Sequence, residues 1–261
     1  MLACSGGPDS VALASVLDRV AREDGFDVHV AHINHGLRES AWQDECVVLS
    51  VAARLGRLVT TQTVAPDGDD EAALRDVRYA ALTAIAQSKS ANTIATAHTA
   101  EDQTETVLLA LFRGTGLDGL AGIAPSRPLA GDVRLVRPFL RATHAELMAE
   151  LRRCALPYAI DPSNAALRYR RNALRAALGG LRDEFPQLDR AVARCAQIVR
   201  DELSDPERAI ARRELRERLR AHGDLRDIPF ERIEAVLDAN PEARVFVKPG
   251  LTFDAGDIRG S

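Results

Sequence analysis

The 261-residue sequence lacks paired cysteines and long apolar runs. The four cysteines are widely scattered and form no Cys-x-x-Cys pair, which argues against a zinc or iron–sulfur site and favours reduced thiols. No stretch of 18 apolar residues occurs, so the sequence predicts no membrane span and no membrane partner. The N-terminus has neither a charged segment nor an apolar segment of a signal peptide. We therefore expect a cytoplasmic protein.

Aromatic residues and lysine are also scarce. Aromatics make up 4% of the sequence against 46% hydrophobic residues, so the core must be built from aliphatic side chains. Lysine occurs only at Lys89 and Lys248, which leaves most basic roles to arginine. Residues 1–140 carry a net charge of −6, residues 141–222 carry +5 and the remaining 39 carry −3. The positive segment could hold a polyanion, but charge alone favours solvated helices with alternating charges.

Short apolar runs alternate with helical periodicity over the first half of the chain. Strands are predicted at residues 2–4, 28–33, 58–64, 93–97 and 133–136, with helices between them. This alternation is typical of an α/β fold with a doubly wound, mostly parallel five-stranded sheet. After Pro138 the pattern becomes helical, and a hairpin is expected near residues 245–253. We predict a catalytic domain over residues 1–184 and a smaller, mainly helical domain over 185–261.

The segment Ser5-Gly6-Gly7-Pro8-Asp9-Ser10 lies between the first predicted strand and the first helix. Glycines there allow close backbone approach, and the amides that open a helix bind anions. The serine hydroxyls add donors, and Asp9 could hold a metal ion bound to phosphates. The loop has no Gly-Lys-Ser/Thr sequence, so it is not a Walker motif. An ordinary Gly-Pro turn is the alternative, but this complete pattern at a strand–helix junction is uncommon.

This pattern resembles the Ser-Gly-Gly-x-Asp-Ser signature of the PP-loop ATP pyrophosphatases. Members of that superfamily bind ATP and transfer AMP to an oxygen of their substrate. The loop alone does not separate NAD synthetases, GMP synthetases, asparagine synthetases, tRNA thiolases and lysidine synthases. Other segments must distinguish among these enzymes.

The second and fourth predicted strands both end in polar segments. His32-Ile33-Asn34-His35-Gly36-Leu37-Arg38 follows the second strand, where side chains face the ligand crevice of such folds. Residues 97–106, Ala-His-Thr-Ala-Glu-Asp-Gln-Thr-Glu-Thr, follow the fourth. Asp102 and Glu105 there share a helix face and could coordinate Mg²⁺ or bind a cationic amine. Both segments resemble lysidine synthases, although Ala97 and Glu101 replace the Gly and first Asp of that family.

Three further blocks occur in the order typical of lysidine synthases. They are Arg137-Pro138-Phe139-Leu140, Asp161-Pro162-Ser163-Asn164 and the stretch 170–175, Arg-Arg-Asn-Ala-Leu-Arg. Arg171 and Arg175 are four residues apart on one helix face, where they could meet phosphates. A basic helix in solvent is the alternative. The resemblance covers roughly residues 2–200.

The resemblance implies a tRNA(Ile)-lysidine synthase activity that uses ATP, Mg²⁺, free L-lysine and a tRNA(Ile) with a CAU anticodon. Nucleotide contacts then fall on Ser5, Gly6, Gly7, Pro8, Asp9, Ser10, His32 and Asn34, with Mg²⁺ on Asp9 and Asp102. Catalytic roles fall on Asp9, Arg78, Asp102 and Arg171. Substrate contacts fall on His98, Asp102, Glu105, Arg113, Arg168, Arg170, Asn172 and Arg175. The resemblance also allows a homodimer and assigns tRNA contact to the C-terminal domain.

Two other hypotheses stay open at this point. A PP-loop tRNA thiolase is the nearest, although such enzymes usually work through paired cysteines, which this sequence lacks. A non-catalytic module that binds adenine nucleotide is the second, and the departures at Ala97 and Glu101 keep it open. ATP–pyrophosphate exchange would separate an enzyme from such a module.

Overall fold

The computed structural model describes residues 1–36, 41–64, 71–160, 170–220, 228–240, 242–249 and 251–254. Six strands within residues 2–136 form one sheet. The strand order is β3-β2-β1-β4-β6-β5, and every neighbouring pair is parallel except β5 with β6. The strands are β1 (Leu2–Ala3), β2 (Val30–Asn34), β3 (Val59–Thr63), β4 (Thr93–Ala95), β5 (Ser126–Pro128) and β6 (Arg134–Val136). The prediction of a mostly parallel α/β sheet is therefore confirmed.

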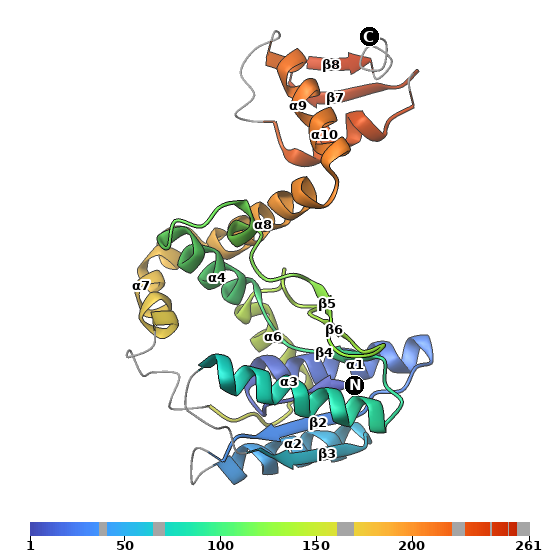
Figure 1. The fold of residues 1–261 in the computed structure, drawn as a ribbon, viewed down its shortest axis with the longest axis vertical. Coiled ribbons are helices and arrows are strands. Elements are labelled where there is room, and N and C mark those ends of the chain that lie inside the picture. Colours follow the sequence, from blue (N-terminus) through green and yellow to red (C-terminus); the bar gives the residue numbers. More distant parts are fainter. Residues whose placement is uncertain are drawn as a thin grey trace. The chain divides into compact units, whose positions relative to one another are not determined.

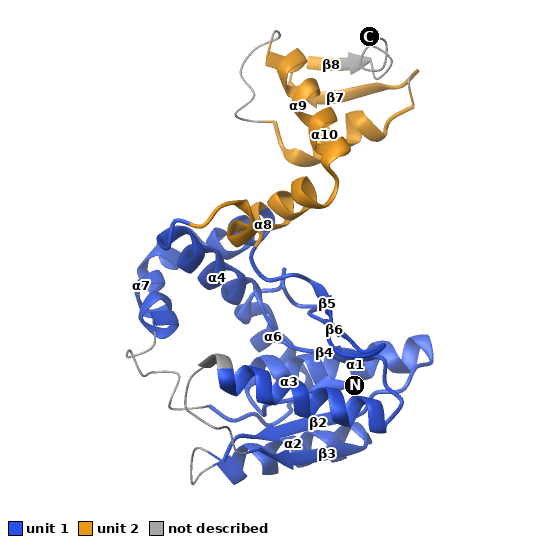
Figure 2. Cartoon of the chain, in the orientation of Figure 1, with its two compact units in different colours: residues 1–114, 122–194 blue, residues 115–121, 195–261 orange. Residues whose placement is uncertain are grey.

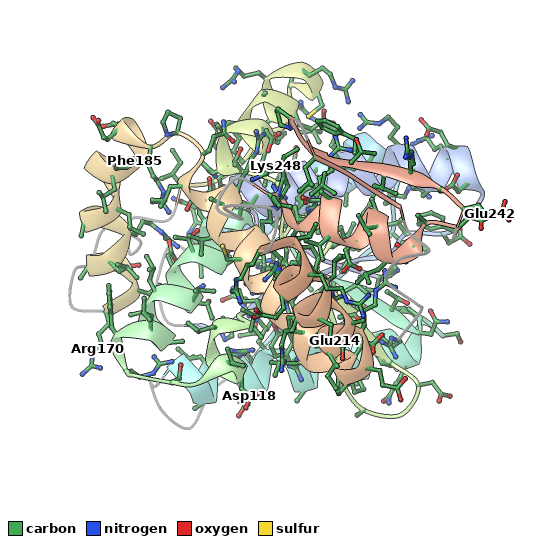
Figure 3. The ribbon with its side chains drawn as sticks, turned by 90° about the horizontal axis from the view of Figure 1, so that it is seen from above. Asp118, Arg170, Phe185, Glu214, Glu242 and Lys248 are labelled. Atoms are coloured by element: carbon green, nitrogen blue, oxygen red, sulfur yellow. The ribbon has the colours of Figure 1, made fainter. Side chains whose placement is uncertain are left out.

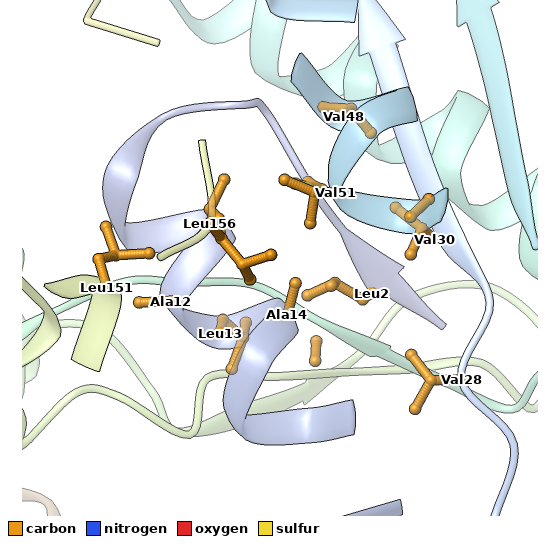
Figure 4. Packing of buried hydrophobic residues seen from close by; sticks show 14 of the residues in the cluster. Leu2, Ala12, Leu13, Ala14, Val28, Val30, Val48, Val51, Leu151 and Leu156 are labelled. Atoms are coloured by element: carbon orange, nitrogen blue, oxygen red, sulfur yellow. The ribbon is translucent and has the colours of Figure 1, made fainter. Parts of the chain in front are cut away.

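Helices cover both faces of this sheet (Figure 1). Successive residues of a strand point to opposite faces, so Val30 joins one hydrophobic cluster and Ala31 the other. The first cluster joins the sheet to α1 (Pro8–Asp24), α2 (Ala41–Leu55) and α6 (His144–Cys154), as Figure 4 shows around Leu2 and Leu13. The second joins the sheet to α3 (Glu71–Ser88). The aliphatic composition thus builds two cores with few rings.

The sixth strand, β5, was not predicted from the sequence. It lies at the edge of the sheet, antiparallel to β6, and contains Pro128. Proline cannot donate a ladder hydrogen bond, so it is confined to edge strands, where the sequence pattern for a strand is weak. The prediction of five strands was wrong for this reason.

The remaining helices are α4 (Ala100–Phe112), α5 (Leu117–Leu120), α7 (Arg170–Glu184), α8 (Leu188–Ser204), α9 (Pro206–Arg220) and α10 (Phe230–Asp238). The predicted capping box at Thr143 is confirmed, because its hydroxyl accepts from the backbone N–H of Glu146 and the Glu146 carboxylate accepts from the backbone N–H of Thr143. Within the described residues, none of the helices is long and apolar enough to cross a membrane.

The chain divides into two compact units, which Figure 2 shows in different colours. The first contains residues 1–114 and 122–194, and the second contains 115–121 and 195–261. The predicted boundary at residue 184 is the end of α7, whereas the first unit runs on into α8. In the second unit, α9 and α10 pack with a hairpin of β7 (Arg244–Lys248) and β8 (Leu251–Asp254) around a small core. The predicted hairpin is therefore present, although Gly250 in its turn lies outside the described residues.

Glu150 joins α6 to α1 inside the first unit. Its Oε1 accepts hydrogen bonds from the Ser15 hydroxyl at 2.9 Å and from Arg19 at 3.2 Å, and Arg153 binds both oxygens. The hydrogen bonds and charge of Arg153, the hydrogen bond from Ser15 and the charge of Arg19 lower the pKa of Glu150 to about 2.

A carboxylate whose pKa falls on folding stabilises the protein above its unfolded pKa, and this contribution is lost as the pH falls toward 2. We expect Glu150→Gln to lower the free energy of unfolding by about 1 kcal/mol at pH 7, after solvent screening. This deficit should shrink between pH 5 and pH 2, as denaturant titrations at several pH values would measure. Glu23→Gln, on the exposed side of α1, is the matched control. An equal deficit at every pH would contradict the ion-pair account.

Candidate active site

The glycine turn between β1 and α1 is held by its own two serines. The hydroxyl of Ser10 donates to the carbonyl oxygen of Gly7 at 2.9 Å and lies 3.2 Å from the hydroxyl of Ser5. The backbone N–H of Ser5 also donates to the Ser10 hydroxyl at 3.2 Å. Ser10 is buried, so its hydroxyl braces the turn in this structure. Gly7 caps α1 without a side-chain hydrogen bond, which leaves amide groups of the first turn as anion donors.

Gly6 allows the turn to pack against α2. Its φ is +89°, in the region that favours glycine, and a Cβ there would lie 2.9 Å from the carbonyl oxygen of Asp44. Pro8 contributes its fixed φ at the start of α1 but has no N–H to donate. The loop is therefore shaped by backbone packing against α2.

Asp9, Glu101 and His144 converge from three helices. Oδ1 of Asp9 lies 2.7 Å from Nδ1 of His144, and the backbone N–H of His144 donates to Oε1 of Glu101 at 2.8 Å. Oε2 of Glu101 is buried without a hydrogen-bond partner. The hydrogen bond to Asp9 raises the pKa of His144. His144 was not predicted from the sequence, where its only signal was its place directly after the capping residue Thr143.

The histidines at the strand ends keep free ring nitrogens. Nδ1 of His32 binds the carbonyl oxygen of Cys4 at 2.9 Å, while its Nε2 is buried without a partner. Nδ1 of His35 is likewise buried and unpartnered. Asn34 accepts from the backbone N–H of Gly36 at 2.8 Å, which fixes the turn after β2. Nδ1 of His98 lies 3.0 Å from the Thr96 hydroxyl. His32 and His35 therefore leave unsatisfied polar atoms at the carboxyl edge of the sheet.

The side chain of Asp102 forms part of the capping box at the start of α4. One carboxylate oxygen accepts from the backbone N–H of Thr99 at 3.0 Å, and the Thr99 hydroxyl accepts in return from the backbone N–H of Asp102. The other oxygen lies 3.5 Å from Arg171. Burial raises the pKa of Asp102, and the charge of Arg171 offsets part of this effect. Asp102 is therefore placed to receive a cation, but its two oxygens already have protein neighbours.

Glu105 is fully buried and binds two arginines of α7. Nε of Arg171 donates to one oxygen at 2.7 Å, and Nε of Arg175 donates to the other at 2.6 Å. Arg171 also donates to the carbonyl oxygen of Asp102 at 3.1 Å. Both arginines were predicted to meet phosphates, and Glu105 was predicted to bind substrate. In this structure the three side chains join α7 to α4, and their contacts to ligands stay predictions.

Several predicted substrate contacts lie away from this centre. Arg113 is exposed at the far end of α4, roughly 16 Å along the helix from Asp102. Arg170 projects from the start of α7 into solvent (Figure 3), and Asn172 is half-buried on the same helix. Arg78, which was predicted to be catalytic, lies on α3 with its guanidinium 5.2 Å from the ring centre of Tyr79, and its charge contributes to the lowered pKa of His98 and of His35. Arg168 and the segments 37–40 and 161–164 lie outside the described residues.

The positive segment is largely paired within the protein. Arg190 binds Glu146, Arg182 binds Asp189, and Arg212 in α9 binds Glu234. Arginines that are neutralised in this way contribute little to attraction of a polyanion. The alternative of helices with alternating charges therefore accounts for much of the positive charge in residues 182–220, since these charges are paired within the protein.

Comparisons with known proteins agree with this geometry. A family model described as a PP-loop domain matches residues 1–181. The tRNA(Ile)-lysidine synthase of Methylobacterium sp. (strain 4-46) is 40% identical over 205 residues, which cover 77% of this chain and 59% of that protein. The same enzyme of Ralstonia nicotianae is 40% identical over 202 residues, which cover 75% and 43%. The chain thus spans about half the length of these curated relatives.

A solved structure with a similar fold is a U34-tRNA thiolase, NcsA, from Methanococcus maripaludis. The TM-score is 0.64 with 14% sequence identity, and the match covers 76% of this chain and 70% of that one. This likeness concerns the fold alone. The glycine turn with Asp9, the mostly parallel sheet and the match over residues 1–181 lead to one conclusion: the chain belongs to the PP-loop domain family.

Proposed function

We propose that this protein is a tRNA(Ile)-lysidine synthase, which attaches free L-lysine to C2 of the wobble cytidine in a CAU anticodon. In the first step the O2 atom of the cytidine attacks the α-phosphate of ATP, and pyrophosphate leaves. In the second step the ε-amino group of lysine attacks C2, a proton is lost from nitrogen, and the C2–O bond breaks to release AMP. The relatives that are 35–40% identical carry this name, which supports the proposal.

The glycine turn and the neighbouring strand end would hold ATP. Main-chain amides of the first turn of α1 would bind phosphate oxygens, because no side chain caps that helix. The amides of Ser5 and Gly7 already donate to the hydroxyls of Ser10 and Ser5. The free Nε2 of His32, at the carboxyl end of β2, would face the nucleoside. These unsatisfied groups are what a bound nucleotide would satisfy.

The oxygen donors at the turn fit Mg²⁺. Asp9 is partly exposed beside the glycines, and the unpartnered Oε2 of Glu101 lies on the residue that also holds His144. Mg²⁺ usually takes one or two carboxylates and completes its shell with phosphate and water. When bound, the ion would neutralise charge that develops on the phosphates. We therefore assign the ion to Asp9 and Glu101, since both oxygens of Asp102 have protein neighbours.

The lysine amine would contact Asp102. Glu105 has both oxygens bound by guanidinium groups, so an amine could reach it only if an arginine left. Asp102 keeps one oxygen at a looser 3.5 Å from Arg171 and remains partly exposed. Burial raises its pKa, and an ammonium group would stabilise its charged form.

The observation that carries the proposal is the convergence of Asp9, Glu101 and His144 beside the glycine turn. The test is mass spectrometry of nucleosides from CAU-anticodon tRNA(Ile) incubated with the protein, ATP, Mg²⁺ and lysine. We expect lysidine, with AMP and pyrophosphate released in equal amounts. Formation of ADP, or a cytidine that stays unmodified, would refute the proposal.

Gly6→Ala tests the turn directly. A methyl group at Gly6 would meet the Asp44 carbonyl oxygen at 2.9 Å and would also require a left-handed φ. The turn must therefore move, and we expect ATP affinity to fall at least about tenfold, as isothermal titration calorimetry would measure. Gly25→Ala is the matched control, because Gly25 also has a positive φ but a Cβ there meets nothing within 4 Å. Equal ATP affinity in both variants would rule out the packing argument.

A further inference from the structure

Gln103 lies on α4 between the motif residues Asp102 and Glu105, and it is 2% exposed. Its Oε1 accepts from the backbone N–H of Ile123 at 2.7 Å, and its Nε2 donates to the carbonyl oxygen of Ile123 at 3.4 Å. The side-chain amide therefore binds both main-chain groups of one residue, as a neighbouring strand would do. This contact attaches a segment 20 residues away to the helix of the candidate active site.

Gly122, directly before Ile123, lies over the plane of this amide. A Cβ at Gly122 would be 2.9 Å from each of Cδ, Nε2 and Oε1 of Gln103, and such equal distances place it above the amide plane. The φ of Gly122 is +63°, in the region that favours glycine. The contact therefore depends on both residues, because a side chain at position 122 would displace the Gln103 amide.

The same segment binds Arg137, which follows β6. The carbonyl oxygen of Ala124 accepts from Nη1 of Arg137 at 2.6 Å, and the carbonyl oxygen of Pro125 accepts from the Arg137 backbone N–H at 2.8 Å. Arg137 is 4% exposed, so close packing limits where its guanidinium can lie. We call residues 122–125 the bridging segment, because they connect Gln103 to Arg137 within four consecutive residues.

The charge of Arg137 acts on His98, which follows β4. Burial and positive charges lower the pKa of His98 to about 3, and Arg137 makes the largest contribution among the charges. His98 was predicted to contact substrate. A displaced Arg137 would therefore change the charge and the access of water at a predicted substrate contact.

We propose that Gln103 is a positioning residue, which fixes the bridging segment and through it the Arg137 guanidinium whose charge reaches His98. Side chains that act on a site keep their geometry only when a supporting layer of hydrogen bonds and packing holds them. In the alternative, Gln103 only stabilises the fold, and the environment of His98 does not depend on it. The consequence for the reaction rests on the proposed function, but the positioning of Arg137 does not.

Titration of His98 tests the proposal without turnover. We would follow the histidine ring signals of the full chain by NMR between about pH 4.5 and pH 8, and assign His98 with the variant His98→Gln. Gln103→Met keeps the length of the side chain and removes both hydrogen bonds. Gly122→Ala keeps Gln103 and pushes on its amide from the other side.

Thr104→Val is the matched control. Thr104 is fully buried next to Gln103, and its hydroxyl donates to the carbonyl oxygen of Ala100 at 3.0 Å within α4. The variant therefore removes a buried hydrogen bond from the same helix without touching the bridging segment.

We expect the pKa of His98 to rise from about 3 to about 5 in Gln103→Met and in Gly122→Ala. A displaced bridging segment moves the positive charge of Arg137 and admits water, and both effects favour the protonated ring. In Thr104→Val the Tm should fall, but His98 should stay neutral over the whole range, as in the wild type. A His98 that stays neutral in both test variants would overturn the proposal, and Gly122→Ala decides alone if Gln103→Met does not fold.

Steady-state kinetics shows the consequence for the reaction. We expect Gln103→Met to raise KM for L-lysine or for tRNA roughly tenfold, with kcat changed by about twofold at most, because His98 was predicted to bind substrate. A fall in kcat with both KM values unchanged would contradict a role at a substrate contact.

The two proposals fail separately. A protein that makes no lysidine but shows the shifted His98 pKa in Gln103→Met would refute the proposed function and keep the positioning role of Gln103. A protein that makes lysidine and shows an unshifted His98 in both variants would do the reverse.

Discussion

Replacing Asp9 by asparagine is expected to abolish AMP release in the presence of tRNA, ATP, Mg²⁺ and lysine. Asp9 is the carboxylate beside the glycine turn, and its partner His144 links it to Glu101. The amide keeps the shape and a hydrogen bond but loses the charge that a metal ion needs. We expect turnover to fall roughly a thousandfold, which liquid chromatography of AMP would measure.

The fold should survive this change, because Asp9 is partly exposed at the start of α1. Asp24→Asn, at the exposed end of the same helix, controls for the lost charge and should retain full turnover. His144→Ala removes the hydrogen bond to Asp9 but leaves the Asp9 carboxylate. This variant therefore separates the effect of the hydrogen bond from the effect of the negative charge. Near-normal AMP release by Asp9→Asn, with wild-type melting, would remove Asp9 from the catalytic machinery.

Glu105→Gln should have the largest effect on stability. The carboxylate is fully buried and accepts hydrogen bonds from both Arg171 and Arg175. The amide removes the nearer counter-charge of the two guanidinium groups, which leaves them Asp102 at 3.5 and 3.9 Å, and it presents N–H donors toward them. Breaking a buried ion pair in this way costs about 3 kcal/mol, which corresponds to a Tm lowered by roughly 6–12 °C in a unit of this size.

Thermal unfolding followed by circular dichroism measures this loss. Glu184→Gln is the matched control, because Glu184 is exposed at the other end of α7 and should leave the Tm unchanged. A Tm unchanged by Glu105→Gln would mean that α7 is held by other contacts. The same geometry means that loss of activity in Arg171→Ala cannot be assigned to chemistry alone, because that variant also leaves Glu105 buried with one partner fewer.

Local signals predicted much of the fold. The spacing of short apolar runs located five of the six strands, because strands of a parallel sheet are buried on both faces and therefore read as continuous apolar runs. The Thr143–Glu146 capping box and the glycine turn could also be predicted, because their hydrogen bonds join residues a few positions apart. The edge strand β5 was missed because Pro128 and its short length give no strand pattern.

The charged side chains of the site were predicted as a set but not as pairs. Asp102, Glu105 and Arg171 were recognised from their motifs, yet their roles were read as contacts to ligands. The structure shows that Glu105 and Arg171, 66 residues apart, bind each other. His144 and Asp9 are 135 residues apart, and no local pattern joins them.

The sequence by itself determined the alternation of strands and helices, the glycine turn and the set of polar residues at the strand ends. These depend on propensity, periodicity and hydrogen bonds within a few residues. Only the tertiary structure decided which carboxylate meets which cation, that Asp9 and Glu101 share His144, and that three arginines lie over the ring of Tyr79. Such partners are chosen by how distant segments pack, because a charge on a helix face interacts with whatever the fold brings within a few ångströms of it.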